Sequence, residues 1–361
     1  MDDLNLIREV LNAPPPSARA TVQARNRLTA AMAAPQPARR RPWRHVLAAV
    51  GTLAGLAALA LVVIPPGGRP DPGPQPPDTS ARGLLLAAAR QAAGADTETG
   101  RYWHVRKVVH SGPFSVGKAP GQYLIIDRDL SEQWIARDPG EPSWTGSRRL
   151  GSRPRGEADE KAWRRAGSPT RWNLPGDGGS VHRSTAPDKG RLDRLNQVPY
   201  LIDLGGFDRA EVQALPTDPD RLRDLFTARI AAGRDGFAPG TGGSDSRLFG
   251  AMCQLLIDVP APPAVRAAAF TVLAGITGMH SIGEVADGLG RTGIGIELAE
   301  HTAEVYEVRR LVVDPVTHLL LASSYSATLA GGDGNRPLKE QHQVILQAGW
   351  TDAKPAIPAL P

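Results

Sequence analysis

An uncharged apolar run of 19 residues, from Val46 to Ile64, constrains this chain more than any other feature. About 20 apolar residues, each rising 1.5 Å, cross a hydrocarbon core roughly 30 Å thick. The residues that anchor its inner end in this interpretation are Arg39, Arg40, Arg41 and Arg44, with Trp43 at the lipid head groups. Because basic residues beside a span stay in the cytoplasm, the run predicts a single-pass protein of the cell membrane. Its N-terminus is expected to be cytoplasmic and its C-terminal domain extracytoplasmic.

The alternative for this run is a cleaved secretory signal peptide. A signal peptide has an apolar stretch of about 7 to 15 residues and ends at a small-residue cleavage site. Here the apolar run is longer, 45 residues precede it, and a Pro-Pro-Gly-Gly sequence follows it. We therefore favour an uncleaved anchor. The predicted parts are a cytoplasmic tail with two short helices (1–45), a transmembrane helix (46–64), a Pro/Gly-rich linker (65–82), an extracytoplasmic domain (83–350) and a disordered C-terminal tail (351–361).

The net charge of +5 follows from this topology. Residues 1–45 contain eight arginines and three acidic residues, and the apolar run contains no charge, so the charges of residues 65–361 balance. The basic excess therefore lies beside the membrane, where it sets the orientation of the span. A nucleic-acid-binding domain needs a basic face on a folded domain, so we expect no direct nucleic-acid partner.

The outer part of the chain has the pattern of an α+β domain, in which helices pack on an antiparallel sheet. Strands are followed by a block of helices and then by strands again. The predicted strands are 101–110, 122–127, 132–138, 293–298, 305–313, 319–326 and 341–348, with a polar turn at 128–131 and a long polar loop at 173–193. The predicted helices are 83–93 and three segments between Thr217 and Gly278, one of which contains Cys253.

No motif in the sequence indicates a cofactor, a metal site or a catalytic centre. The segment 112–119 resembles a phosphate-binding loop, but Ala119 stands where a magnesium-binding hydroxyl is needed, and Pro120 blocks the following helix. Residues 288–293 have the glycine spacing of a dinucleotide site, yet an alternating strand follows, so we expect a turn. The eight histidines lack metal-ligand spacing. Cys253, on an apolar helix face, is expected to be a buried, inert thiol.

Five of the seven tryptophans fall in the first predicted sheet and the residues after it: Trp103, Trp134, Trp144, Trp163 and Trp172. Two interpretations remain open. The tryptophans fill the core under the helices, or they line an apolar cavity for a lipid, a polymer or a partner.

Several stretches of the chain resemble an actinobacterial family of single-pass membrane proteins encoded beside extracytoplasmic-function sigma factors. These stretches are LNAPPPSARATVQARNRL, SEQWI, DEKAWRRAGSPTRW, DPDRLRDLF, VPAPPAVRAAAFTVLAGITGM, DGLGRTGIGIEL and LVVDPVTHLLLASS. The resemblance implies an anti-sigma-like regulatory role and supplies no functional residues. Zinc-bearing anti-sigma domains carry a His-x-x-x-Cys-x-x-Cys cluster, and residues 1–45 contain no cysteine. The outer part also looks like the open half-barrels of periplasmic lipoprotein carriers and of envelope-stress regulators.

Three hypotheses follow from these observations. The leading one is a membrane-anchored, non-enzymatic regulator whose outer domain senses an envelope signal and whose residues 1–33 bind a cytoplasmic partner such as a sigma factor. The second is an anchored module that binds a lipid or another apolar ligand outside the cell. The third is an extracytoplasmic enzyme, although no nucleophile, base and orienting group can be assembled from motif spacing.

Overall fold

The computed structural model describes residues 80–360 except 96–98, 119–120, 177–178, 196–199, 201–205, 234–242, 302–304 and 330–335. All of them belong to the second of the chain's two units, residues 76–361. Three predicted parts lie outside the described residues: the cytoplasmic tail, the span at 46–64, and residues 65–79 of the linker. The predicted anchors of the span also lie outside them, namely Arg39, Arg40, Arg41, Trp43 and Arg44. None of the helices in the described part is long and apolar enough to cross a membrane.

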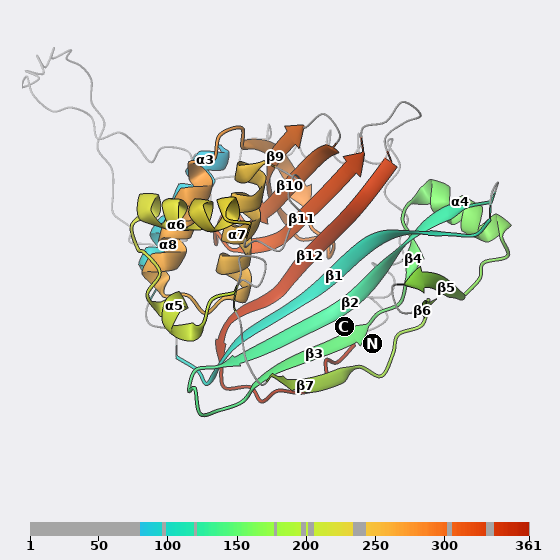
Figure 1. The fold of residues 1–361 in the computed structure, drawn as a ribbon, viewed down its shortest axis with the longest axis horizontal. Helices are drawn as coiled ribbons and strands as arrows, with labels where there is room; N and C mark the ends of the chain where they lie inside the picture. Colours follow the sequence, from blue (N-terminus) through green and yellow to red (C-terminus); the bar gives the residue numbers. More distant parts are fainter. Residues whose placement is uncertain are drawn as a thin grey trace, which may run out of the picture. The chain divides into compact units, whose positions relative to one another are not determined.

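The described residues form an α+β fold with one large antiparallel sheet, which confirms the predicted class (Figure 1). The strand order is β7-β3-β2-β1-β12-β11-β10-β9-β8, and β4 pairs with β2. The strand bounds are β1 Tyr102–Val116, β2 Tyr123–Ala136, β3 Ser143–Arg149, β4 Arg153–Pro154, β7 Arg191–Leu195, β8 His280–Ala286, β9 Thr292–His301, β10 Val305–Val313, β11 Leu320–Leu329 and β12 Arg336–Thr351. Strands β5 (Arg171–Gly176) and β6 (Gly179–Ser184) form a separate hairpin.

The first and last strands of this unit join two strand groups into one sheet. Strand β1 pairs with β12 from Tyr102 opposite Thr351 to Gly112 opposite Glu340. Each group is built mainly from neighbouring antiparallel strands, β1 to β3 before the helical block and β8 to β12 after it. The sequence predicted two strand groups, and the β1–β12 pairing shows how they combine.

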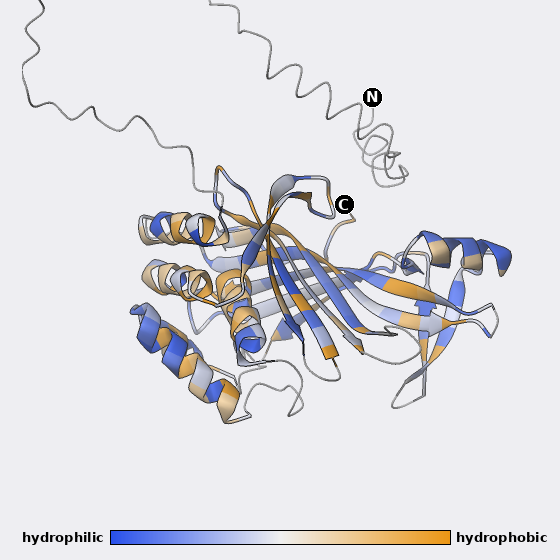
Figure 2. Ribbon diagram, turned by 90° about the horizontal axis from the view of Figure 1, so that it is seen from above, coloured by the Kyte–Doolittle hydropathy of each residue, from blue (hydrophilic) through white to orange (hydrophobic). Residues whose placement is uncertain are grey.

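Helices cover one face of the sheet, as Figures 1 and 2 show. These are α3 (Ala81–Ala93), α6 (Pro219–Ala231), α7 (Ser244–Asp258) and α8 (Pro263–Ala274), whereas α4 (Glu157–Arg165) lies near β2 and β4, and α5 (Arg209–Gln213) precedes α6. Alternate strand residues face the helices, because successive side chains of a strand point to opposite faces. The main core therefore combines strand and helix residues. It contains Trp103 of β1, Ile296 of β9 and Leu311 of β10 together with Leu255 of α7 and Leu273 of α8.

The predicted turn at 128–131 is wrong, because β2 runs without a break from Tyr123 to Ala136. Both neighbouring strands continue past this segment: Val108 lies opposite Leu130, and Asp129 lies opposite Arg149. Leu130 is fully buried, and the Arg128 guanidinium donates to the carbonyl oxygens of Leu150 and Gly151. Arg128 therefore finds its partners in the chain that follows β3, which a local pattern of polar residues does not show.

The predicted loop at 173–193 also differs from the structure, which places most of β5, all of β6 and the start of β7 there. Strand β7 pairs with β3 at the edge of the sheet. The β5–β6 hairpin is held to β2 by an ion pair between Arg183 and Asp127, and the Arg183 guanidinium lies over the Phe114 ring. These long-range contacts override the low strand propensity of a segment rich in glycine, aspartate and serine.

The C-terminal segment predicted to be a disordered tail lies on the sheet. Strand β12 extends to Thr351, and residues 352–360 continue without helix or strand. Pro358 is buried, and a side chain at Gly146 of β3 would meet its ring at 2.9 Å. Proline restricts the unfolded chain and so lowers the entropy cost of ordering it. We attribute the ordering of residues 352–360 to this effect and to the contact between Pro358 and Gly146.

Candidate functional site

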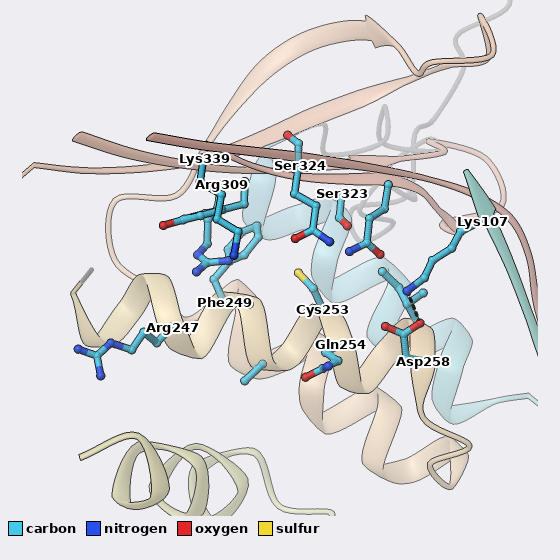
Figure 3. A pocket seen from close by; sticks show the side chains of 16 residues that line it. Lys107, Arg247, Phe249, Cys253, Gln254, Asp258, Arg309, Ser323, Ser324 and Lys339 are labelled. Atoms are coloured by element: carbon cyan, nitrogen blue, oxygen red, sulfur yellow. Dashed lines mark hydrogen bonds and ion pairs between the residues drawn. The ribbon is translucent and has the colours of Figure 1, made fainter. Parts of the chain in front are cut away.

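A cavity of about 440 Å3 lies between α7 and strands β1, β10, β11 and β12, and charged and polar side chains from these elements converge on it. Figure 3 shows α7 along one wall and side chains of the strands along the other. The lining contains four basic side chains and one acidic one: Lys107, Arg247, Arg309, Lys339 and Asp258. Serine, glutamine and tyrosine side chains supply most of the remaining surface, so the cavity is polar and basic.

Helix α7 supplies one wall of the cavity. Its residues that line the cavity include Phe249, Gly250, Cys253, Gln254 and Asp258, and Phe249 and Cys253 also belong to the main core together with Leu248, Met252 and Leu255. Gly250 leaves room for the strand opposite, since an added Cβ would lie 2.8 Å from Nη1 of Arg309. The Arg309 side chain therefore lies directly against the backbone of α7.

A buried polar network holds Arg309 in this position. The Arg309 Nε donates to Ser246 Oγ at 2.6 Å, and Ser246 Oγ in turn donates to the Glu307 carboxylate at 3.0 Å. The Tyr325 hydroxyl donates to the other oxygen of Glu307 at 2.8 Å, and the Arg309 guanidinium lies 4.4 Å from the Tyr325 ring centroid. Glu307 and Ser246 are 3% and 1% exposed, so water does not compete for these bonds.

This burial changes the proton affinity of two members of the network. Desolvation lowers the pKa of Arg309 from its usual value, although Tyr325, Cys253 and Glu307 oppose the change. Desolvation and the hydrogen bond to Glu307 raise the pKa of Tyr325 well above its usual value. Tyr325 therefore remains a neutral hydrogen-bond donor at physiological pH.

The N-terminus of α7 is fixed by a residue from the sheet. Helix α7 begins after Gly243, which has no side chain to cap it. The Glu300 carboxylate of β9 accepts hydrogen bonds from the backbone N–H groups of Gly243 at 2.9 Å and Ser246 at 3.2 Å. A carboxylate at this helix end satisfies free N–H groups and interacts favourably with the helix dipole, and so it sets the position of α7 over the strands.

The other charges of the cavity lie closer to its openings. Lys107 and Asp258 form a partly buried ion pair at 2.7 Å, drawn as the dashed line in Figure 3. Lys339 is exposed, and its Nζ lies 5.9 Å from the Tyr325 ring centroid. With Asp258 paired to Lys107 and the Glu307 carboxylate beside Arg309, the exposed Lys339 supplies a positive charge to the lining, which favours an anionic ligand.

Cys253 lines this cavity but is buried, in agreement with the sequence prediction. Burial raises the pKa of its thiol to about 12. Because the thiolate is the reactive form, Cys253 is not a nucleophile at neutral pH. The described residues contain no group of three or more His, Cys, Asp or Glu side chains placed to hold a metal ion.

The five tryptophans lie in three separate clusters of buried residues and do not line one common cavity. Trp103 belongs to the main core, where it meets Trp350 edge to face with a centroid distance of 5.8 Å. Trp134 and Trp144 pack with Tyr102 on the opposite face of the sheet. Trp163 and Trp172 pack with Tyr123 near α4 and the β5–β6 hairpin.

Sequence analysis missed the residues that line the basic cavity, apart from Cys253. A signal for two of them does exist in β10, VYEVRRLVV, where Glu307 and Arg309 share the alternation phase of the buried Leu311 and Val313. Ionisable residues on the buried face of a strand are expected to have partners. Their partners Ser246 and Tyr325 are far away in sequence, so no local pattern identifies them.

A histidine pair lies on the sheet face that the helices leave open. His110 of β1 is opposite His342 of β12, with ring centroids 5.6 Å apart. Burial lowers the pKa of His110 to about 4, with help from Arg153, His342 and Arg128, and burial also lowers that of His342. Both rings are therefore neutral at physiological pH.

Comparisons with known proteins add little to this geometry. No model of a protein family matches the chain, and no curated protein matches it significantly. Among solved structures the chain is similar to "GphF Dehydratase 1", with 14% identity over 74% of this chain and 83% of that chain and a TM-score of 0.13. A likeness at that TM-score carries no argument about fold or activity.

Proposed function

We propose that this chain is a membrane-anchored, non-enzymatic regulator whose cavity under α7 binds a small anionic ligand outside the cell. The observation that carries the proposal is the polar, basic lining of this cavity. A buried network holds Arg309 of β10 there, and the exposed Lys339 belongs to β12. Small-molecule sites are typically preformed cavities with a few fixed polar groups. The apolar run at 46–64 supports the anchor.

The finer fold that we infer is an open half-barrel with helices on its inner face. The order of the sheet supports this, because β7 and β8 stand at two separate ends. In such a fold the space between the helices and the sheet is the natural place for a ligand. Binding there would change the distance between α7 and the strands, and we propose this as the signal that residues 1–45 pass to a cytoplasmic partner.

Replacing Lys339 with glutamate tests the ligand class. An exposed charge near a bound anion contributes about 1 kcal/mol, so Lys339→Glu is expected to weaken binding of citrate or inorganic phosphate roughly tenfold. Isothermal titration calorimetry at low ionic strength measures the dissociation constants. The matched control is Lys189→Glu, which makes the same charge change at an exposed lysine outside the cavity. Equal affinities in the two variants, or no anion binding by the unmodified chain, would contradict the proposal.

Deleting residues 1–33 tests the regulatory part of the proposal. We expect a sigma factor to co-purify with the full-length protein from detergent-solubilised membranes and to be lost with the deletion, as identified by mass spectrometry. The motivation is the short amphipathic segments before the span together with the family resemblance. A cytoplasmic partner absent from both samples would shift the interpretation to a ligand-binding module alone.

A module for an apolar ligand is the second candidate. A smaller groove of about 210 Å3 favours it, since this groove lies between α3, α8 and the sheet and is lined in part by Ala88, Ala92, Leu256, Phe270 and Leu320. Stabilisation by a fatty acid, with no effect of citrate or phosphate, would favour this candidate.

A further inference from the structure

The C-terminal segment occupies a groove on the sheet face opposite the helices. Near the labelled C-terminus in Figure 1, residues 352–360 pass over β3 and reach the start of β7. Added Cβ atoms at Gly146 and Gly190 would lie 2.9 Å from Pro358 and Ile357. The Arg106 guanidinium donates to the carbonyl oxygen of Ala359 at 3.2 Å.

The sequence of this segment is that of a polyproline II ligand. It reads KPAIPALP, with prolines at 355, 358 and 361. Each proline ring fixes φ near −65°, and the residue before each proline is held in the extended region. A spacing of three residues matches the three residues per turn of a polyproline II helix, so the prolines share one edge. Such segments bind in grooves lined by aromatic side chains, and they lose little conformational entropy on binding because the polyproline II helix is already formed.

Aromatic side chains form the floor of the groove. The rings of His104 on β1 and Trp134 on β2 stack with a centroid distance of 4.6 Å and an interplanar angle of 8°. Trp144 and Tyr102 pack beside Trp134, and an added Cβ at Gly146 would meet both the Trp134 ring, at 3.2 Å, and Pro358. The absence of a side chain at Gly146 is therefore what makes the groove deep enough for a proline ring.

The bound segment leaves polar atoms of the floor unused. His104 and Trp134 are 6% and 3% exposed. His104 Nε2 contacts the Glu132 carboxylate at 2.9 Å, but within the described part of the chain His104 Nδ1 and Trp134 Nε1 have no hydrogen-bond partner. Ile357 and Leu360 remain about half exposed. The C-terminal segment thus packs over these rings while its two largest apolar side chains stay about half exposed.

From these contacts we propose that the groove over β2 and β3 is a recognition site for proline-rich segments with P-x-x-P spacing, which residues 354–360 occupy in the free protein. A partner segment of this kind would place a proline ring over Gly146 and accept a hydrogen bond from Arg106, as the bound C-terminal segment does. The tethered segment has an effective concentration on the order of 1 mM, so a partner must compete with it.

The test measures binding of the fluorescein-labelled peptide KPAIPALP to the full-length protein by fluorescence anisotropy. The variant Pro355→Ser/Pro358→Ser weakens the tethered segment, and we expect it to bind the peptide at least tenfold more tightly than the unmodified chain does. A control peptide with serine at both positions, KSAISALP, is expected not to bind. Far-UV circular dichroism establishes that the variant is folded.

Two further substitutions in that variant locate the site. Gly146→Val fills the space of the proline ring and is expected to abolish binding, and Arg106→Met removes the bond to the backbone carbonyl and is expected to weaken binding about fivefold. The proposal is overturned if the folded double variant does not bind the peptide, if the unmodified chain binds it equally well, or if Arg106→Met leaves the affinity unchanged.

Discussion

Replacing Glu307 with alanine is expected to lower the free energy of unfolding by about 3 kcal/mol. The Glu307 carboxylate accepts hydrogen bonds from Ser246 Oγ at 3.0 Å and from the Tyr325 hydroxyl at 2.8 Å, and Glu307 is only 3% exposed. Alanine leaves both hydroxyl groups without this acceptor, and it removes the negative charge beside the largely buried Arg309 guanidinium. Each buried polar group without a partner costs about 1 to 3 kcal/mol.

Urea unfolding followed by circular dichroism measures this loss, and the melting temperature is expected to fall by about 6 to 12 °C. Glu307→Gln keeps one acceptor oxygen, so its free energy of unfolding is expected to fall by less than that of Glu307→Ala. The matched control is Glu284→Ala, which removes an exposed glutamate on β8 and should change the unfolding free energy by less than about 0.5 kcal/mol. If Glu307→Ala were no more destabilising than this control, the network would not support the cavity wall.

The second large effect is expected at Gly151, between β3 and β4. Its φ is +95°, a conformation that favours glycine. An added Cβ would lie 2.1 Å from the Thr185 carbonyl oxygen and 2.6 Å from the Thr185 carbonyl carbon. Backbone atoms cannot move aside as a flexible side chain can, so the end of β6 must shift. The neighbouring bond from Ser152 N to the Ser184 carbonyl oxygen, 2.8 Å long, would be disturbed too.

We expect Gly151→Ala to lower the free energy of unfolding by about 3 kcal/mol, as the sum of backbone strain and this clash. Gly167→Ala is the control, because Gly167 also has a positive φ, +83°, but an added Cβ there meets nothing within 4 Å. Strain alone costs about 1 to 2 kcal/mol. Denaturant titrations that gave equal losses for the two variants would show that the close approach to Thr185 does not matter.

Local patterns predicted α3, α6, α7 and α8 because the signals at helix ends act over a few residues, whereas the short helix α5 was not predicted. Asp218 caps α6 through a bond from the Arg221 backbone N–H to its carboxylate at 2.9 Å. The turn at 314–317 forms for the same kind of reason, since the Asp314 carboxylate accepts from the N–H groups of Val316 and Thr317 at 2.8 Å. These hydrogen bonds also lower the pKa of Asp314.

Patterns failed where a neighbour distant in sequence supplies the missing interaction. The polar stretch within β2 pairs with β1 and β3, and the polar segment at 191–195 becomes an edge strand because β3 is beside it. Strand β8 was not predicted, because exposed residues dominate it and it has no apolar alternation. In each case the backbone hydrogen bonds are made to a strand whose position local sequence does not indicate.

The sequence by itself determined the α+β class, the helical block between two strand groups, the glycine-rich turn before β9 and the burial of Cys253. These depend on periodicity, capping and turn residues, which are properties of neighbouring positions. Only the tertiary structure decided that β1 pairs with β12 and that Glu307, Arg309, Ser246 and Tyr325 meet under α7. It also decided that Pro358 packs against β3 rather than lying in solvent. The reason is physical. Strand pairing and hydrogen bonds join residues that are 18 to 253 positions apart, and the energies of these interactions depend on the packed neighbours rather than on the local chain.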